Sequence, residues 1–296
     1  MLVRAVIPHY FREINEGETI RLGEGFGSRQ RGAKQKRALA LQRCLSGLIN
    51  LRRSNRQLML DITQAKAEEF DVQSDVRLSK EVSIEIVVAV HSQDTCLDQI
   101  LLLNHSHLRI LLCSDIDPIN LGLAARDYLL HHESPADLNL YLEDDLVVHD
   151  SLFLDKLIWF AEVTDHQMVL MPHRYESLAS SHSCGSLFID GKICPDFIAH
   201  WHRPQKDVFS SSFMHEPPVH FDCPSNPHSG FFALTKNQVK KISCHQLPTD
   251  GFVGPLETAA TFTVGLSFKI MKPSLRNAMF LCVEHGFPSF LGYVGK

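Results

Sequence analysis

Residues 138–159 read LNLYLEDDLVVHDSLFLDKLIW, and this stretch decides the fold class. Its first five residues are mostly apolar and predict a buried β-strand, which ends directly in three acidic residues at 143–145. Asp150 or Ser151 can then cap a helix whose apolar side chains recur at helical spacing. The stretch therefore predicts a strand, an acidic turn and a helix, in that order.

Strand-like and helical segments alternate on both sides of this stretch, up to Met171. This alternation favours βαβ units and a mainly parallel, twisted sheet flanked by helices, as in Rossmann-like α/β proteins. The polar residues 60–80 predict an excursion from the core. The expected strands are 2–7, 82–91, 108–113, 138–142 and 168–171, and the expected helices are 33–53, 94–103 (capped by Asp94), 120–132 and 152–160.

The second half of the chain has a different pattern. Residues 175–230 are rich in Ser, His and Pro and predict loops and short hairpins at one end of the sheet. A helix is expected at 255–266 and a last strand at 268–271. Because no repeat or low-complexity linker interrupts the chain, we expect one domain over 1–296, with a loop-rich, mixed C-terminal half.

Composition excludes several classes of protein. The chain has 296 residues, of which 44% are hydrophobic and 21% charged, and a net charge of −5 gives no drive toward nucleic acid. The eight cysteines form no CxxC pair, which disfavours a zinc ribbon and favours free, buried thiols. The apolar run in MLVRAVIPHY is too short for a secretory signal. We expect a cytoplasmic protein that could also contact a membrane surface.

The acidic triplet is Glu143, Asp144 and Asp145. Neighbouring carboxylates at the carboxyl end of a parallel strand lie where α/β proteins bind ligands, and burying them is costly without a cation. Mn²⁺ or Mg²⁺ fits such oxygen ligands. Strand alternation would put Glu143 and Asp145 on one side, with Asp145 as the direct metal ligand and Glu143 or Asp144 near a ribose or a metal-bound water. The alternative is a solvated acidic turn.

The run LYLEDDLVVHDSLFLDKLIWF, residues 140–160, resembles the DxD-type segment of GT-A glycosyltransferases. The similarity is greatest to the EDDL form of N-acetylglucosaminyltransferase I-like and exostosin-like enzymes. The resemblance implies that Asp145 binds Mn²⁺, which holds the diphosphate of a UDP- or GDP-sugar. It also implies transfer of the sugar to a glycan, lipid or protein hydroxyl. Residues 1–150 would then be the nucleotide-binding half and residues 151–296 the acceptor-binding half.

Donor contacts are expected near the first strands. Pro8, His9 and Tyr10 end the first strand, where GT-A enzymes begin their nucleotide contacts, so His9 or Tyr10 could stack on the base. Asp115 follows the third expected strand and could reach the nucleoside. The basic, glycine-rich stretch 22–32 offers backbone N–H groups to phosphate, but a solvated loop is the simpler interpretation.

Acceptor-side residues are expected in the C-terminal half. GPLETAATF resembles a segment that opens a helix beneath the acceptor in related enzymes, which implies Glu257 as the base and Asp250 as the second choice. His285 resembles the C-terminal histidine that many of these enzymes place on the metal or the diphosphate. Arg174 could hold the acceptor or form a surface pair with Glu176.

Two other functions remain open at this stage. A nucleotidyltransferase also uses a parallel sheet and metal-binding carboxylates, but Pro8 and His9 stand where its glycine-rich loop with a lysine would begin. A non-catalytic module that binds nucleotide sugars or glycans is the third hypothesis. The metal interpretation depends on the triplet facing a site. It would be undermined if these acids pointed into bulk solvent or were neutralised by lysines and arginines.

Overall fold

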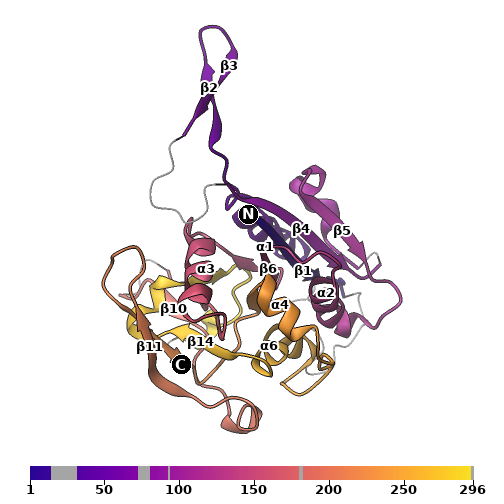
Figure 1. Ribbon diagram of the computed structural model, residues 1–296. Coiled ribbons are helices and arrows are strands. Elements are labelled where there is room, and N and C mark those ends of the chain that lie inside the picture. The colour runs from indigo at the N-terminus through magenta and orange to yellow at the C-terminus, as the bar shows by residue number, and fades with distance from the viewer. Residues whose placement is uncertain (15–31, 73–80, 93, 180–182, 295–296) are drawn as a thin grey trace.

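The computed structural model describes residues 1–14, 32–72, 81–92, 94–179 and 183–294 (Figure 1). A five-stranded sheet with the order β13-β6-β1-β4-β5 forms the centre. Four of its strands are parallel, and β13 runs antiparallel to β6. This confirms the expected α/β class with a mainly parallel sheet. The strands are β1 (Leu2–His9), β4 (Ser83–Val90), β5 (Leu108–Leu112), β6 (Leu138–Leu142) and β13 (Phe231–Thr235).

Helices cover both faces of the central sheet, as Figure 1 shows. Alternate residues of β1 belong to two different core clusters, with Ala5 and Ile7 in one and Val6 in the other. The first cluster includes α1 (Lys34–Ile49) and α3 (Phe153–Val163), and the second includes α2 (Leu121–Leu130) and α4 (Lys236–Ile242). This double burial explains why the strands are almost continuously apolar.

The C-terminal half contributes two smaller sheets and a continuous helical segment. One sheet has the order β10-β9-β15-β7 and the other β11-β12-β14-β8. The helical segment is α5 (Pro255–Glu257), a π-helical turn (Thr258–Phe262) and α6 (Thr263–Gly265). The strands are β7 (Leu146–Val147), β8 (Met168–Leu170), β9 (His173–Ser177), β10 (Ser186–Phe188), β11 (Gln205–Ser211), β12 (Val219–Cys223), β14 (Lys269–Pro273) and β15 (Cys282–His285).

A hairpin of β2 (Arg56–Asp61) and β3 (Lys66–Asp71) projects away from the rest of the molecule (Figure 1). It confirms the excursion expected at 60–80 for the residues up to 72, although the hairpin begins earlier; residues 73–80 lie outside the described residues. All but one of its strand residues are exposed.

Two local expectations were wrong. The helix expected at 94–103 is instead two 3₁₀ turns, Leu97–Gln99 and Leu101–Asn104. Asp94 does not cap the first turn, since Cys96 occupies the N-cap position and no side chain caps it. The Asp94 carbonyl accepts a hydrogen bond from the Phe11 N–H at 3.0 Å and ties this segment to the end of β1. The second error concerns the cysteines: all eight are free, but Cys184, Cys194 and Cys244 are exposed rather than buried. Within the described ranges, no helix combines the length and apolar character needed to span a bilayer.

Helix α1 packs closely against the segment that follows the acidic triplet, and Gly47 permits this contact. A Cβ atom at Gly47 would lie 2.8 Å from the Val148 carbonyl oxygen, which is backbone and cannot move aside easily. We predict that Gly47→Ala destabilises the protein by about 1–2 kcal/mol, because the overpacking cost outweighs the usual helical gain of alanine. Urea unfolding would measure this, with Gly191→Ala, which has open space, as the control. An unchanged midpoint would contradict the predicted contact.

Candidate active site

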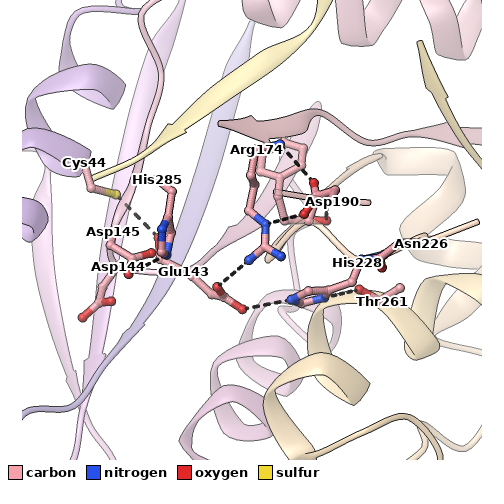
Figure 2. Close-up of polar contacts among 12 residues, drawn as sticks. Cys44, Glu143, Asp144, Asp145, Arg174, Asp190, Asn226, His228, Thr261 and His285 are labelled. Atoms are coloured by element: carbon pink, nitrogen blue, oxygen red, sulfur yellow. Dashed lines mark hydrogen bonds and ion pairs between the residues drawn. The ribbon is translucent and has the colours of Figure 1, made fainter. Parts of the chain in front are cut away.

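The acidic triplet lies at the carboxyl end of β6, beside the end of β1. β6 stops at Leu142, and the chain then turns, with the Leu146 N–H donating to the Glu143 carbonyl at 3.2 Å. Because the strand has ended, its alternation does not apply, and the expected sharing of one side by Glu143 and Asp145 is wrong. Asp144 and Asp145 instead share one arginine partner, Arg37. Glu143 lies toward Arg174 and His228 (Figure 2).

Asp144 is held by two buried side chains. The His9 Nδ1–H donates to Asp144 Oδ2 at 2.5 Å, while His9 Nε2 accepts the Cys96 backbone N–H at 3.2 Å. The second partner is Arg37, whose Nη2 donates to Asp144 Oδ1. His9 is fully buried, so in this conformation its ring orients Asp144 and has no face open to a nucleotide base.

Asp145 meets Arg37 and His285. Arg37 Nη1 donates to Asp145 Oδ2 at 3.0 Å, and His285 Nε2 lies 3.5 Å from the same oxygen. Burial alone would raise the pKa of Asp145, but the contact with His285 and the charges of Arg37 and Arg174 outweigh it and hold the pKa well below the usual range. Burial likewise opposes the charge on His285, yet Asp145 and Glu176 raise its pKa to about 9.

The orientation of His285 comes from β15 and β9. β15 pairs with β7 so that His285 stands opposite Leu146, the residue after Asp145. The His285 Nδ1–H donates to Glu176 Oε1 at 2.8 Å, and the same carboxylate accepts the backbone N–H groups of Ser289 and Phe290. The ring is therefore fixed with Nε2 toward Asp145.

Glu143 points toward β9 and the loop before β13. Its carboxylate lies 3.6 Å from Arg174 Nη1 and 3.6 Å from His228 Nε2, which are longer than hydrogen bonds (Figure 2). Burial raises the pKa of Glu143 to about 7, since the charges of Asp145 and Glu257 add to it and Arg174 offsets only part. Gly230 is favoured here because its φ of +61° strains residues with a side chain, and a Cβ atom would also lie 2.5 Å from Glu143 Oε2.

Arg174 belongs to a buried chain of charges. Its Nε donates to Asp190 Oδ1 at 2.9 Å, and Lys272 Nζ donates to Asp190 Oδ2 at 2.8 Å. Burial opposes the charge on Asp190, but Arg174 and Lys272 outweigh it and hold the pKa of this carboxyl well below its usual range. Desolvation lowers the pKa of Lys272 to about 8. The surface pair between Arg174 and Glu176 does not form, because Arg174 pairs with Asp190 and Glu176 with His285.

The two expected bases occupy different environments. Glu257 is half-buried in α5, and its charge contributes to the raised pKa of Glu143. The π-helical turn that follows places Thr261 Oγ1 2.9 Å from His228 Nδ1, so it supports the residues around Glu143. Asp250 is exposed, and no contact in the described part of the chain joins it to the triplet.

The expected donor residues lie at the same edge of the sheet. Pro8 and His9 are the last two residues of β1, which runs two residues beyond the strand expected at 2–7, and both are buried. Tyr10 packs beside His91 with ring centroids 6.3 Å apart. Asp115 is exposed after β5, which lies three strands from β6 in the central sheet. Most of the glycine-rich stretch 22–32 lies outside the described residues.

The sequence analysis named Glu176 only as a possible surface partner of Arg174 and missed its contact with His285. Four further residues of the site were missed altogether: Arg37, Asp190, His228 and Lys272. Arg37 carried a usable signal, because it lies four residues before Leu41 and eight before Leu45 and so falls on the apolar face of its helix. A charged side chain on such a face needs a buried partner. Asp190 and Lys272 gave no comparable signal, since each stands beside a short apolar run.

No known protein-family profile matches the chain, and no curated protein matches its sequence. Among solved structures, residues 1–349 of S. aureus TarS align at 10% identity with a TM-score of 0.45, over 96% of this chain and 60% of that one. A Pyrobaculum calidifontis mannosyltransferase, solved with GDP-Man and Mn²⁺, aligns at 12% identity with a TM-score of 0.45, over 97% of this chain and 57% of that one. UTP-bound UGPase from Acinetobacter baumannii aligns at 12% identity with a TM-score of 0.44, over 99% of this chain and 91% of that one. These weak similarities decide nothing about function.

The raised pKa of Glu143 predicts a pH-dependent stability. The folded protein holds this proton more tightly than the unfolded chain does, so its contribution to the free energy of unfolding is complete below pH 4.5 and is lost as pH rises through 7. In Glu143→Gln the side chain is neutral at every pH and resembles the protonated carboxyl group. Relative to the original protein, the variant should therefore gain up to about 3 kcal/mol between pH 4.5 and pH 8.

Urea unfolding in EDTA at pH 4.5, 6, 7 and 8 would measure this difference. Glu69→Gln in the exposed strand β3 supplies the baseline. If the difference between Glu143→Gln and the original protein stayed constant with pH, the carboxyl group would have no raised pKa.

Proposed function

We propose that the chain is a glycosyltransferase that moves a sugar from a nucleotide-diphosphate sugar to an acceptor hydroxyl. One observation supports this above the others. Three acidic residues are gathered at the ligand-binding edge of a parallel sheet, and a histidine from the last strand is directed at one of them. Glu143, Asp145 and His285 have strongly shifted pKa values and come together from distant parts of the sequence. Such clusters of perturbed ionisable groups are typical of functional sites.

Asp145 and His285 are the residues that would hold Mn²⁺ or Mg²⁺. Asp145 Oδ1 is buried without a hydrogen-bond partner among the described residues, so it has an unused acceptor. Once its Nε2 has lost its proton, His285 has the carboxylate support on its other nitrogen that metal-binding histidines usually have. No group of three or more ligating side chains occurs in the described part of the chain. An ion held by this pair would take its remaining ligands from a diphosphate and water.

The ion, when bound, neutralises the negative charge that develops on the leaving diphosphate. The triplet contacts arginines, which is the arrangement that the sequence analysis named as evidence against a metal site. Arg37 occupies both Asp144 and Asp145, and Arg174 lies near Glu143. An ion placed between His285 and the oxygen that it faces, Asp145 Oδ2, therefore requires Arg37 to leave that oxygen.

The remaining residues divide between donor and acceptor. On the donor side we propose that Tyr10 and Asp115 contact the nucleoside, while Pro8 shapes the end of β1 and His9 acts by orienting Asp144. On the acceptor side, Glu257 is proposed to take the proton from the attacking hydroxyl, since it lies near Glu143 and opens a helix. Asp250 remains a second choice, and Arg174 offsets part of the charge of Glu143.

The first test concerns nucleotide and metal together. We expect UDP or GDP to raise the melting temperature in the presence of Mn²⁺ but not in EDTA, because the diphosphate and Asp145 complete the coordination of the ion. Asp145→Asn should abolish this shift, whereas Asp71→Asn in the exposed hairpin should leave it intact. Differential scanning fluorimetry with a panel of UDP- and GDP-sugars gives the readout.

Other outcomes of this assay are equally informative. A shift by nucleoside diphosphate that persists in EDTA would refute metal dependence and leave sugar transfer standing. Stabilisation only by nucleoside triphosphates, with release of pyrophosphate, would identify a nucleotidyltransferase. No response to any nucleotide would refute the enzymatic proposal and favour a glycan-binding module.

The second test concerns Glu257. General-base catalysis contributes about 10²–10⁴-fold to a rate, so Glu257→Gln should lower kcat by at least about 10²-fold. The melting-temperature shift caused by nucleotide should stay unchanged, because Glu257 is proposed to act on the acceptor. Asp250→Asn is the comparison, and a loss of kcat in that variant alone would transfer the role to Asp250.

A further inference from the structure

Arg37 stands in the first turn of α1 and is almost completely buried, with 5% of its surface exposed. Its two terminal nitrogens contact different carboxylates, Nη1 with Asp145 and Nη2 with Asp144. The ring of Phe287, which follows β15, covers the guanidinium at 4.8 Å. Arg37 is therefore a fixed positive charge between the two aspartates, and its charge persists at any pH of interest.

The contact with Asp145 is made on the oxygen that His285 also faces. Both Arg37 Nη1 and His285 Nε2 approach Asp145 Oδ2, at 3.0 and 3.5 Å. A divalent ion shared by Asp145 and His285 would need this position, and it would be repelled by a guanidinium that stayed there. The cation and Arg37 therefore cannot both occupy Asp145 Oδ2.

The ion pair also leaves polar atoms without partners. Arg37 Nε and Asp145 Oδ1 are both buried and make no hydrogen bond within the described part of the chain. An unsatisfied donor and an unsatisfied acceptor in one buried cluster reduce the stability that the pair would otherwise have. This incomplete pairing is consistent with an arginine that a better ligand can displace.

From these contacts we propose that Arg37 is a built-in cation that competes with the divalent metal for Asp145. The inference rests on the proposed function, in which that metal is bound. In the absence of nucleotide, Arg37 neutralises the two aspartates and keeps the affinity for the free ion low. A nucleoside diphosphate offers Arg37 a new anionic partner, so that the metal and the nucleotide bind cooperatively rather than independently.

The test measures Mn²⁺ binding directly, by electron paramagnetic resonance of the free ion, without any assay of activity. Arg37→Gln keeps hydrogen-bonding groups beside the aspartates but removes the charge. We expect it to bind Mn²⁺ without nucleotide at least about tenfold more tightly than the original protein, and to lose most of the cooperativity with UDP or GDP. Its melting temperature should fall in EDTA and recover with Mn²⁺.

Arg43→Gln is the matched control. Arg43 lies on the same helix and makes a bidentate pair with Glu284, at 2.9 and 2.7 Å, without touching the triplet. If Arg37→Gln does not fold in EDTA, Arg37→Lys keeps the charge and should bind Mn²⁺ like the original protein, while Arg37→Gln prepared in Mn²⁺ should lose its structure when the ion is chelated.

The outcomes separate the two proposals. If the original protein binds Mn²⁺ with UDP or GDP but Arg37→Gln shows no gain in affinity for the free ion, the competition is refuted and the metal-dependent function stands. If neither protein binds Mn²⁺ with or without a nucleotide, the metal site itself is refuted, and the competition with it.

Discussion

The neutralisation of neighbouring buried carboxylates is the constraint on which the rest of the site depends. Asp144 and Asp145 leave the end of β6 into a nearly water-free environment, where two adjacent negative charges are unstable without a cation. Arg37 supplies one positive charge, and His9 and His285 supply hydrogen-bond or charge contacts. Elements from both ends of the chain must therefore meet at this point, which couples the folding of α1 and β15 to the end of β6.

A second group of charges lies on the other side of Glu143 and has a different character. Arg174, Asp190 and Lys272 satisfy one another through short contacts, so they form a structural support. Glu143 stands between this support and the aspartates, without a close partner of its own. Its raised pKa follows from that intermediate position.

Much of the architecture was predictable from local pattern. The strand at 138–142 matches β6, and the alternation of segments gave the parallel sheet, because burial on both faces produces apolar runs that are readable in sequence. The antiparallel strand β13 was not foreseen as a neighbour of β6, since pairing between distant segments leaves no local trace. The helix expected at 94–103 is two 3₁₀ turns, and the hydrogen bond that ties Asp94 to Phe11 is another contact between distant segments that local sequence does not show.

The sequence by itself determined that three acids follow a buried strand, and chemistry then indicated that they need a positive partner. Only the tertiary structure decided which partner they have. Arg37, 106 positions or more before the triplet, reaches Asp144 and Asp145 because α1 packs over the sheet edge, and His285 reaches Asp145 because β15 pairs with β7. Charge compensation depends on distances of a few ångströms, and such distances between remote segments are set by packing and strand pairing rather than by local sequence.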